Sequence, residues 1–158
     1  MKTILITGGL GYIGHSLTKF LSTMTKTRII VTDSNFLPDR VAWLRRHNIE
    51  FHHKNIFEIS DLVKQADSIY HLAGVTAVPQ VASQATPEKD SEIKRVGIDG
   101  TQAILAYMKS DAKIIFTSTH VVFEGIKDVT RGLNEADAPY PVLAYSYSLH
   151  ISIMLHHQ

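Results

Sequence analysis

A glycine-rich turn near the N-terminus constrains the fold of this chain more than any other feature of its sequence. Residues 7–14 read Thr-Gly-Gly-Leu-Gly-Tyr-Ile-Gly. The stretch before the turn, residues 2–7, is short and rich in β-branched side chains, which is typical of a buried strand. Residues 12–24 have helical spacing, and the helical pattern predicts one apolar face made by Ile13, Leu17, Phe20 and Leu21. A glycine turn between a strand and a helix is typical of the first unit of a parallel α/β sheet.

The glycines of this turn suit a bound dinucleotide. Gly8 permits the tight turn, Gly11 lets the backbone approach a pyrophosphate, and Gly14 lets the helix pack closely on the sheet. The N-terminus of the helix adds free N–H groups and a partial positive charge of about half a unit. We therefore expect these glycines, with Tyr12 and Ile13 at the start of the helix, to bind the cofactor. A turn that binds no ligand is the alternative.

A carboxylate follows the second predicted strand at the spacing that nucleotide binding requires. Asp33 lies 19 positions after Gly14, at the end of the apolar stretch 28–32. A carboxylate about 20 residues beyond the glycines accepts hydrogen bonds from the ribose hydroxyls of NAD and repels the 2′-phosphate of NADP. We therefore predict NAD rather than NADP, and Arg40 is the nearest arginine that could serve a 2′-phosphate. A capping or turn role for Asp33 is the alternative.

Strand-like and helix-like segments alternate along the rest of the chain. The predicted strands are residues 28–32, 49–53, 68–73 and 113–117, the predicted helices are 38–46, 59–66, 91–110 and 142–158, and the predicted loops are 76–90 and 124–141. This order predicts an α/β fold, a Rossmann-type doubly wound parallel sheet with helices on both faces. At 158 residues, the chain is expected to form one NAD(P)-binding domain over residues 1–158.

Composition excludes several classes of partner. The chain has 16 basic and 15 acidic residues, a formal net charge of +1, which predicts no surface for nucleic acid or for an anionic membrane. It has no cysteine, so it has neither disulfides nor thiolate metal ligands, and we predict no metal site. No apolar stretch approaches the roughly 20 residues that span a bilayer, and the N-terminal one is too short for a signal peptide. We therefore expect a cytoplasmic protein.

The turn has the form TGxxGxxG, and several later motifs accompany it in order. They are residues 70–74 (YHLAG), Gly100-Thr101, and residues 115–119 (IFTST). Together they resemble the extended short-chain dehydrogenase/reductase family, the NAD-dependent epimerase/dehydratase group, over nearly the whole chain. The resemblance implies cofactor contacts at Leu72, Ala73 and Gly74. It also implies them at Asn55 and Ile56, because Asn55 stands where an acid often contacts adenine.

The resemblance implies a catalytic apparatus that is incomplete. It places the family's hydroxyl on Thr119, to hold the substrate oxygen, and its tyrosine on Tyr145, to exchange a proton while hydride moves to or from the nicotinamide. The family's lysine, four residues after the tyrosine, lowers the pKa of that tyrosine, but here the position is Leu149. Losing about three pKa units of stabilisation costs about 4 kcal/mol, or on the order of a thousandfold in rate. Gly97 also stands where the family usually has an asparagine.

The sequence leaves several functions open. One is an epimerase or dehydratase that transfers hydride between NAD and a sugar-nucleotide substrate, impaired in this chain. Residues 119–125 (THVVFEG), 134–135 and 139–141 resemble the 3-beta-hydroxysteroid dehydrogenase branch, which implies oxidation of a sterol-like secondary alcohol. The intact glycine turn beside Leu149 also fits a non-catalytic NAD-binding module. The sequence does not decide whether the chain is an active enzyme.

The likeness to the family weakens after Tyr147, and extended members continue for well over a hundred residues more. We therefore expect the substrate-binding C-terminal region to be absent and the substrate to stay undetermined. The family also implies a homodimer through the helices that carry Thr101 and Tyr145.

Overall fold

The computed structural model describes residues 1–24, 26–75, 84–127 and 130–155. Contacts group the chain into two units, the first made of Met1–Gly74 with Gly100–Thr117 and the second of Val75–Asp99 with Ser118–Gln158. Part of the predicted 76–90 loop, residues 76–83, and the end of the predicted C-terminal helix, residues 156–158, lie outside the described residues. A single domain over the whole chain stays a prediction.

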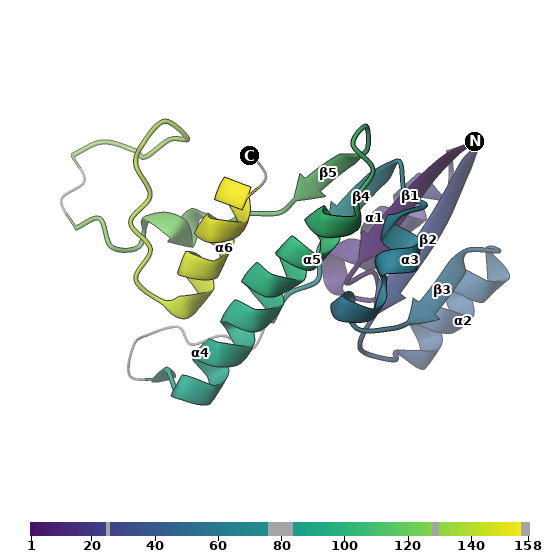
Figure 1. The fold of residues 1–158 in the computed structure, drawn as a ribbon, viewed down its shortest axis with the longest axis horizontal. Coiled ribbons are helices and arrows are strands. Elements are labelled where there is room, and N and C mark those ends of the chain that lie inside the picture. The colour runs from purple at the N-terminus through teal and green to yellow at the C-terminus, as the bar shows by residue number, and fades with distance from the viewer. Residues whose placement is uncertain (25, 76–83, 128–129, 156–158) are drawn as a thin grey trace. The chain divides into compact units, whose positions relative to one another are not determined.

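The first unit contains a five-stranded parallel sheet in the order β3-β2-β1-β4-β5 (Figure 1). Its strands are β1 (Lys2–Thr7), β2 (Thr27–Asp33), β3 (Glu50–His53), β4 (Ser68–His71) and β5 (Lys113–Phe116). The chain moves outward from β1 to β3 and then returns to the other side of β1 with β4. Strand order therefore reverses at β1, the place where open α/β sheets bind ligands at the carboxyl ends of their strands. The predicted doubly wound parallel sheet is confirmed.

Helices cover both faces of this sheet because both faces are apolar. The helical segments of the first unit are α1 (Tyr12–Leu21), α2 (Pro38–Arg46), η1 (Ile56–Glu58), α3 (Ser60–Val63) and α5 (Gly100–Tyr107). Leu5 joins a buried cluster with side chains of α3 and α5, and its neighbour Ile6 joins a second cluster with side chains of α1 and α2. Successive strand side chains point to opposite faces, so β1 supplies both cores. Figure 1 shows α3 and α5 in front of the sheet and α1 behind it.

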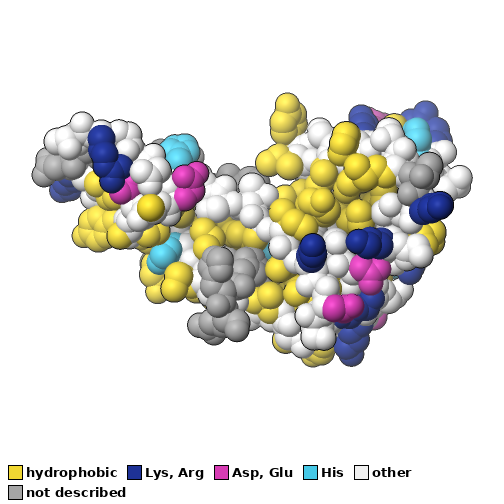
Figure 2. Space-filling view, turned by 90° about the horizontal axis from the view of Figure 1, so that it is seen from above, with side chains coloured by type: hydrophobic (Ala, Val, Ile, Leu, Met, Phe, Trp, Pro, Cys, Tyr) yellow, Lys and Arg dark blue, Asp and Glu magenta, His cyan; other side chains and the backbone are white. Residues whose placement is uncertain are grey.

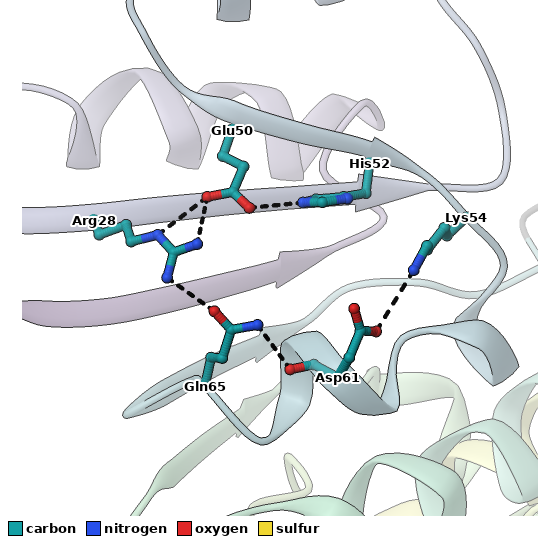
Figure 3. A network of polar contacts seen from close by, with 6 residues as sticks. All are labelled: Arg28, Glu50, His52, Lys54, Asp61 and Gln65. Atoms are coloured by element: carbon teal, nitrogen blue, oxygen red, sulfur yellow. Dashed lines mark hydrogen bonds and ion pairs between the residues drawn. The ribbon is translucent and has the colours of Figure 1, made fainter.

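A polar network ties the outer strand β3 to its neighbours (Figure 3). Arg28 donates to Glu50 Oε2 from Nε at 3.1 Å and from Nη2 at 2.6 Å, and His52 Nε2 lies 2.8 Å from Glu50 Oε1. Arg28 also donates to Gln65 Oε1 at 3.0 Å. The hydrogen bond with His52 lowers the pKa of Glu50, burial opposes this, and Arg28 lowers the pKa further. The charged carboxylate thus secures β3, and charge on an outer strand discourages pairing with another chain.

The second unit packs helices through small side chains. Its helical segments are α4 (Pro87–Lys94), the π-helical η3 (Arg95–Asp99), η4 (His120–Phe123) and α6 (Ala144–Leu155), and α6 packs on α4 and η3. Ser152 Oγ donates to Gly97 O at 2.9 Å, and a Cβ added to Gly97 would lie 2.9 Å from Ser148 Oγ. Close approach of α6 therefore explains why this chain has glycine where the family pattern has asparagine.

Several predicted boundaries differ from the structure, among them the ends of the helices predicted over 59–66 and 91–110, which lie at Val63 and Tyr107, and three of the differences have local reasons. The helix predicted from residue 91 begins at Pro87, where Thr86 caps it by accepting the Lys89 N–H at 3.3 Å. Helix α1 ends at Leu21 rather than at residue 24, because the hydroxyls of Ser22 and Thr23 donate hydrogen bonds to main-chain carbonyls three residues earlier. Strand β4 ends at His71 rather than at residue 73: the Leu72 N–H is shared between the carbonyl and the hydroxyl of Thr7, and the Ala73 N–H binds that hydroxyl.

Hydrophobic side chains also gather on the surface (Figure 2). In the first unit, Phe20 on α1 is 61% exposed and Ile115 on β5 is 40% exposed. Contiguous exposed apolar surface is typical of a face that another protein segment covers. Among the helices that the described residues form, none combines the length and apolar character that a bilayer span requires.

Candidate functional site

The glycine turn folds so tightly that side chains have no room. Gly8 has a φ of 65°, and a Cβ on it would lie 2.7 Å from Leu72 O at the end of β4. A Cβ on Gly14 would lie 2.4 Å from Gly8 O, across the turn itself. The Gly11 N–H donates to Gly8 O at 3.0 Å and closes the turn. Gly8 and Gly14 are therefore required by the close approach of backbone to backbone within the turn.

The first turn of α1 presents free donors beside this loop. Gly11 occupies the N-cap position in an extended conformation, no side chain caps the helix, and the first turn has no acidic residue. The side chains of Tyr12 and Ile13 are 85% and 55% exposed and so do not cover the turn. N–H groups of a first helical turn lack intrahelical acceptors and, with the helix dipole, bind anions such as phosphate. The predicted phosphate site thus has open donors.

Asp33 lies at the end of β2 with both carboxylate oxygens already engaged. Its Oδ2 accepts the Leu10 N–H at 2.9 Å, and its Oδ1 accepts the Asn35 N–H at 2.9 Å. The turn role considered as an alternative is therefore present. Each carboxylate oxygen has two acceptor positions, so each keeps one for a ribose hydroxyl. Arg40 donates to the carbonyl of Leu10, so Asp33 and Arg40 hold the same loop residue from opposite ends.

The other residues predicted to bind the cofactor also lie in the first unit. The N–H groups of Leu72 and Ala73 both bind Thr7 Oγ1 at 3.2 Å, next to Gly8. Gly74 comes next, and a Cβ added to it would have no atom within 4 Å. Asn55 caps η1 by accepting the Phe57 N–H at 3.2 Å.

Ile56 packs differently from the other predicted cofactor residues. Its side chain is 8% exposed and lies against Gly100. Only the backbone of Ile56 therefore remains for a cofactor contact.

Two features of this site were not predicted. Leu10 is fully buried in the cluster beneath the loop, and the hydroxyl of Thr7 binds the end of β4. The glycine motif places both residues next to the turn, but the sequence cannot show which of the loop's side chains points inward.

His15 is a buried histidine on α1 whose Nδ1 has no hydrogen-bond partner among the described residues. Its ring packs edge-on against Trp43, with ring centroids 5.3 Å apart. Burial lowers the pKa of His15, and the positive charges of Lys19 and Arg40 lower it further. The fold therefore holds this imidazole in the neutral form.

We expect His15→Leu to flatten the acid dependence of stability. The unfolded chain protonates this histidine below about pH 6.5, whereas the folded chain resists protonation, so the stability from neutral His15 is present above that pH and is lost as pH falls. Urea unfolding at pH 7.5, 6.5 and 5.5 measures this loss, with exposed His120→Leu as the control. Equal pH slopes for the wild type and His15→Leu would contradict it.

The second unit contains both residues predicted to be catalytic. Thr119 caps η4, and its Oγ1 accepts the Val121 N–H at 3.5 Å. Tyr145 lies in the first turn of α6, and η4 packs against this helix. One turn after Tyr145, Leu149 is half-buried and carries no charge. The described part of this unit therefore offers a hydroxyl and a phenol but no cation at the lysine position.

Glu124 fixes the start of α6. Its Oε1 accepts the N–H of Leu143 at 2.7 Å and of Val142 at 2.9 Å, and it accepts the hydroxyl of Ser146. Burial raises the pKa of Glu124, but the hydrogen bond from Ser146 and the two backbone N–H groups outweigh burial and lower it. A carboxylate at a helix N-terminus is also favoured by the helix dipole. Glu124 thus orients the turn that carries Tyr145.

Comparison with known proteins identifies relatives along nearly the whole chain. The model of the NAD dependent epimerase/dehydratase family matches residues 4–157. UDP-N-acetyl-alpha-D-glucosaminuronate decarboxylase of Bacillus cytotoxicus is 34% identical over 128 residues, 77% of this chain and 38% of the relative. CDP-paratose 2-epimerase of Salmonella typhi is 28% identical over 145 residues, 87% of this chain and 42% of the relative.

Solved structures share the fold. A UDP-glucuronic acid 4-epimerase variant from Bacillus cereus, in complex with NAD and a fluorinated UDP-sugar, matches with a TM-score of 0.83 at 22% identity, covering 98% of this chain and 51% of that one. UDP-glucose-4-epimerase from Stenotrophomonas maltophila, with bound NAD, matches with a TM-score of 0.81 at 21% identity. The match covers 99% of this chain and 48% of that one. The chain thus spans about half of these structures and 38–42% of the two curated relatives.

Proposed function

Because this chain belongs to the NAD dependent epimerase/dehydratase family, we propose that its first unit binds NAD. The observation that carries the proposal is the glycine turn, where a Cβ on Gly14 would meet Gly8 O at 2.4 Å beside uncapped first-turn N–H groups. A pyrophosphate fits such bare backbone, and Asp33 keeps one acceptor position on each oxygen for the adenosine ribose. The bound NAD of the structural neighbours supports the same cofactor.

We propose sugar nucleotides as the substrate class of the whole protein. Both curated relatives are named for nucleotide-linked sugars, and this favours sugar nucleotides over a sterol-like alcohol. When bound, NAD supplies the hydride acceptor and donor. In this chain the Thr119 hydroxyl would hold the sugar oxygen, and the Tyr145 phenol would exchange its proton.

Leu149 favours a second candidate, a module that binds NAD without turnover. Leu149 stands one turn after Tyr145, where the family's lysine would assist the tyrosine, and this favours binding without turnover. Incubation of the purified chain with NAD and UDP-glucose, followed by chromatography of the sugar, separates the candidates: turnover would exclude the passive module. A homodimer and a cytoplasmic location stay predictions from the sequence.

Calorimetric titration with NAD tests the binding proposal. We expect saturable binding by the wild type and about tenfold or greater weakening in Asp33→Ala, which loses hydrogen bonds between a charged carboxylate and the ribose. Asp39→Ala is the matched control, because Asp39 is an exposed acid on the neighbouring helix α2. NADP is expected to bind more weakly than NAD, because its 2′-phosphate meets the Asp33 carboxylate. A folded wild type that gives no saturable signal with millimolar NAD would overturn the proposal.

A further inference from the structure

Three buried polar side chains connect the central strands of the first unit to α5. Thr7 Oγ1 lies 2.9 Å from His71 Nδ1, and His71 Nε2 lies 3.2 Å from Thr101 Oγ1. The three side chains are 0–1% exposed. Thr7 and His71 are paired in the register of β1 and β4, at the carboxyl ends of these strands. The connection therefore lies at the edge of the sheet where the glycine turn begins.

The partners of Thr7 assign the tautomer of His71. Thr7 Oγ1 accepts the N–H groups of Leu72 and Ala73, each at 3.2 Å. A hydroxyl has two acceptor positions and one hydrogen, so the remaining hydrogen of Thr7 is donated to His71 Nδ1. Nδ1 is then unprotonated, and a neutral imidazole carries its hydrogen on Nε2, which donates to Thr101.

This tautomer matters because the groups that it orients touch the glycine turn. With its hydrogen committed to His71, the Thr7 hydroxyl presents both acceptor positions to the end of β4. The segment held in this way is the one that Gly8 approaches, since a Cβ on Gly8 would lie 2.7 Å from Leu72 O and 2.8 Å from Ala73 N. The Leu72 N–H also donates to the carbonyl of Thr7 at 3.2 Å, so rotation of the Thr7 hydroxyl would release chiefly the Ala73 N–H next to the turn.

We propose that His71 is a positioning residue for the dinucleotide and acts through Thr7. Held as the Nε2–H tautomer, it fixes the Thr7 hydroxyl, which holds the end of β4 against Gly8 in the geometry that binds NAD. The inference rests on the proposed NAD binding, and because His71 is only 1% exposed it would act through the groups that it orients. In this tautomer Thr101 Oγ1 accepts the hydrogen of Nε2 on the other side of the ring.

Matched variants separate this role from a contribution to stability alone. Thr7→Val removes the hydroxyl but keeps the shape, and His71→Leu removes the acceptor, so both are expected to weaken NAD binding about tenfold or more. Thr7→Ser keeps the hydroxyl, and His71→Asn keeps an oxygen near the Nδ1 position, so both are expected to bind within about threefold of the wild type. Thr101→Val is expected to lower the unfolding temperature while affinity stays within about threefold.

The tautomer is measured independently of the cofactor. Long-range ¹H–¹⁵N spectra of histidine-labelled protein are expected to show His71 as the Nε2–H tautomer, and a protonated Nδ1 would overturn the inference. NAD binding that is unchanged in Thr7→Val, or weakened equally in Thr101→Val, would overturn the positioning role and leave the proposed function intact. A wild type with the expected tautomer that binds no NAD would instead refute the proposed function, and the positioning role with it.

Discussion

Gly14→Ala is expected to weaken NAD binding by about a hundredfold or more. The added Cβ would lie 2.4 Å from Gly8 O and 2.7 Å from Gly9 Cα, both backbone atoms that cannot rotate away. The turn must therefore open, at a cost of about 1–3 kcal/mol in the free energy of unfolding. Displacing two N–H donors from a phosphate loses about 1.5 kcal/mol each, which together is about a hundredfold in affinity.

Gly132→Ala is the matched control for Gly14→Ala. A Cβ on Gly132 has no atom within 4 Å, so the same chemical change meets no steric conflict there. Titration calorimetry gives the affinity of each variant, and urea unfolding gives its stability. If Gly14→Ala binds NAD as tightly as Gly132→Ala does, the close approach of the turn is not what forms the phosphate site.

The core strands and the glycine turn could be predicted because local sequence determines them. Lys2–Thr7 and Pro38–Arg46 form the strand and the helix predicted for them. The strand is a short run rich in β-branched residues before a glycine turn, and the helix begins at a proline. The position of Asp33 at the end of β2, next to the glycine turn, follows from its spacing in the sequence. These features depend on residues close together in sequence, and so they are visible without the fold.

The orientation of α1 could not be predicted from its apolar period. Of the predicted face, Leu17 and Leu21 pack into the core, but Ile13 and Phe20 are 55% and 61% exposed. The other buried residues of the helix are Gly14, His15 and Thr18. The requirement that Gly14 lie against Gly8 sets the rotation of the helix, and it outweighs the burial of two apolar side chains. Contacts between distant segments, such as the one between Thr7 and His71, are likewise invisible to periodicity because they depend on strand order.

The helix predicted over residues 91–110 shows a similar limit. Gly97 and Gly100 weaken a helical pattern, yet the chain continues from α4 through η3 into α5. Each glycine is explained by a partner distant in sequence, Ser148 for Gly97 and Ile56 for Gly100. A glycine that is needed for packing cannot be told from a helix breaker until those partners are known.

Leu10→Ala is expected to destabilise the first unit by about 2–5 kcal/mol and to weaken NAD binding as a consequence. Leu10 is fully buried in the cluster with Ile6, Val31 and Leu44, so it anchors the glycine turn to the core between the sheet and α1. Its N–H also binds Asp33, so loss of the side chain loosens the carboxylate that would hold the ribose. Tyr12→Ala is the control two residues away: its side chain is 85% exposed, and its change in unfolding free energy is expected to stay within about 0.5 kcal/mol. Urea unfolding measures both variants, and equal stabilities would show that the turn holds its shape without the buried leucine.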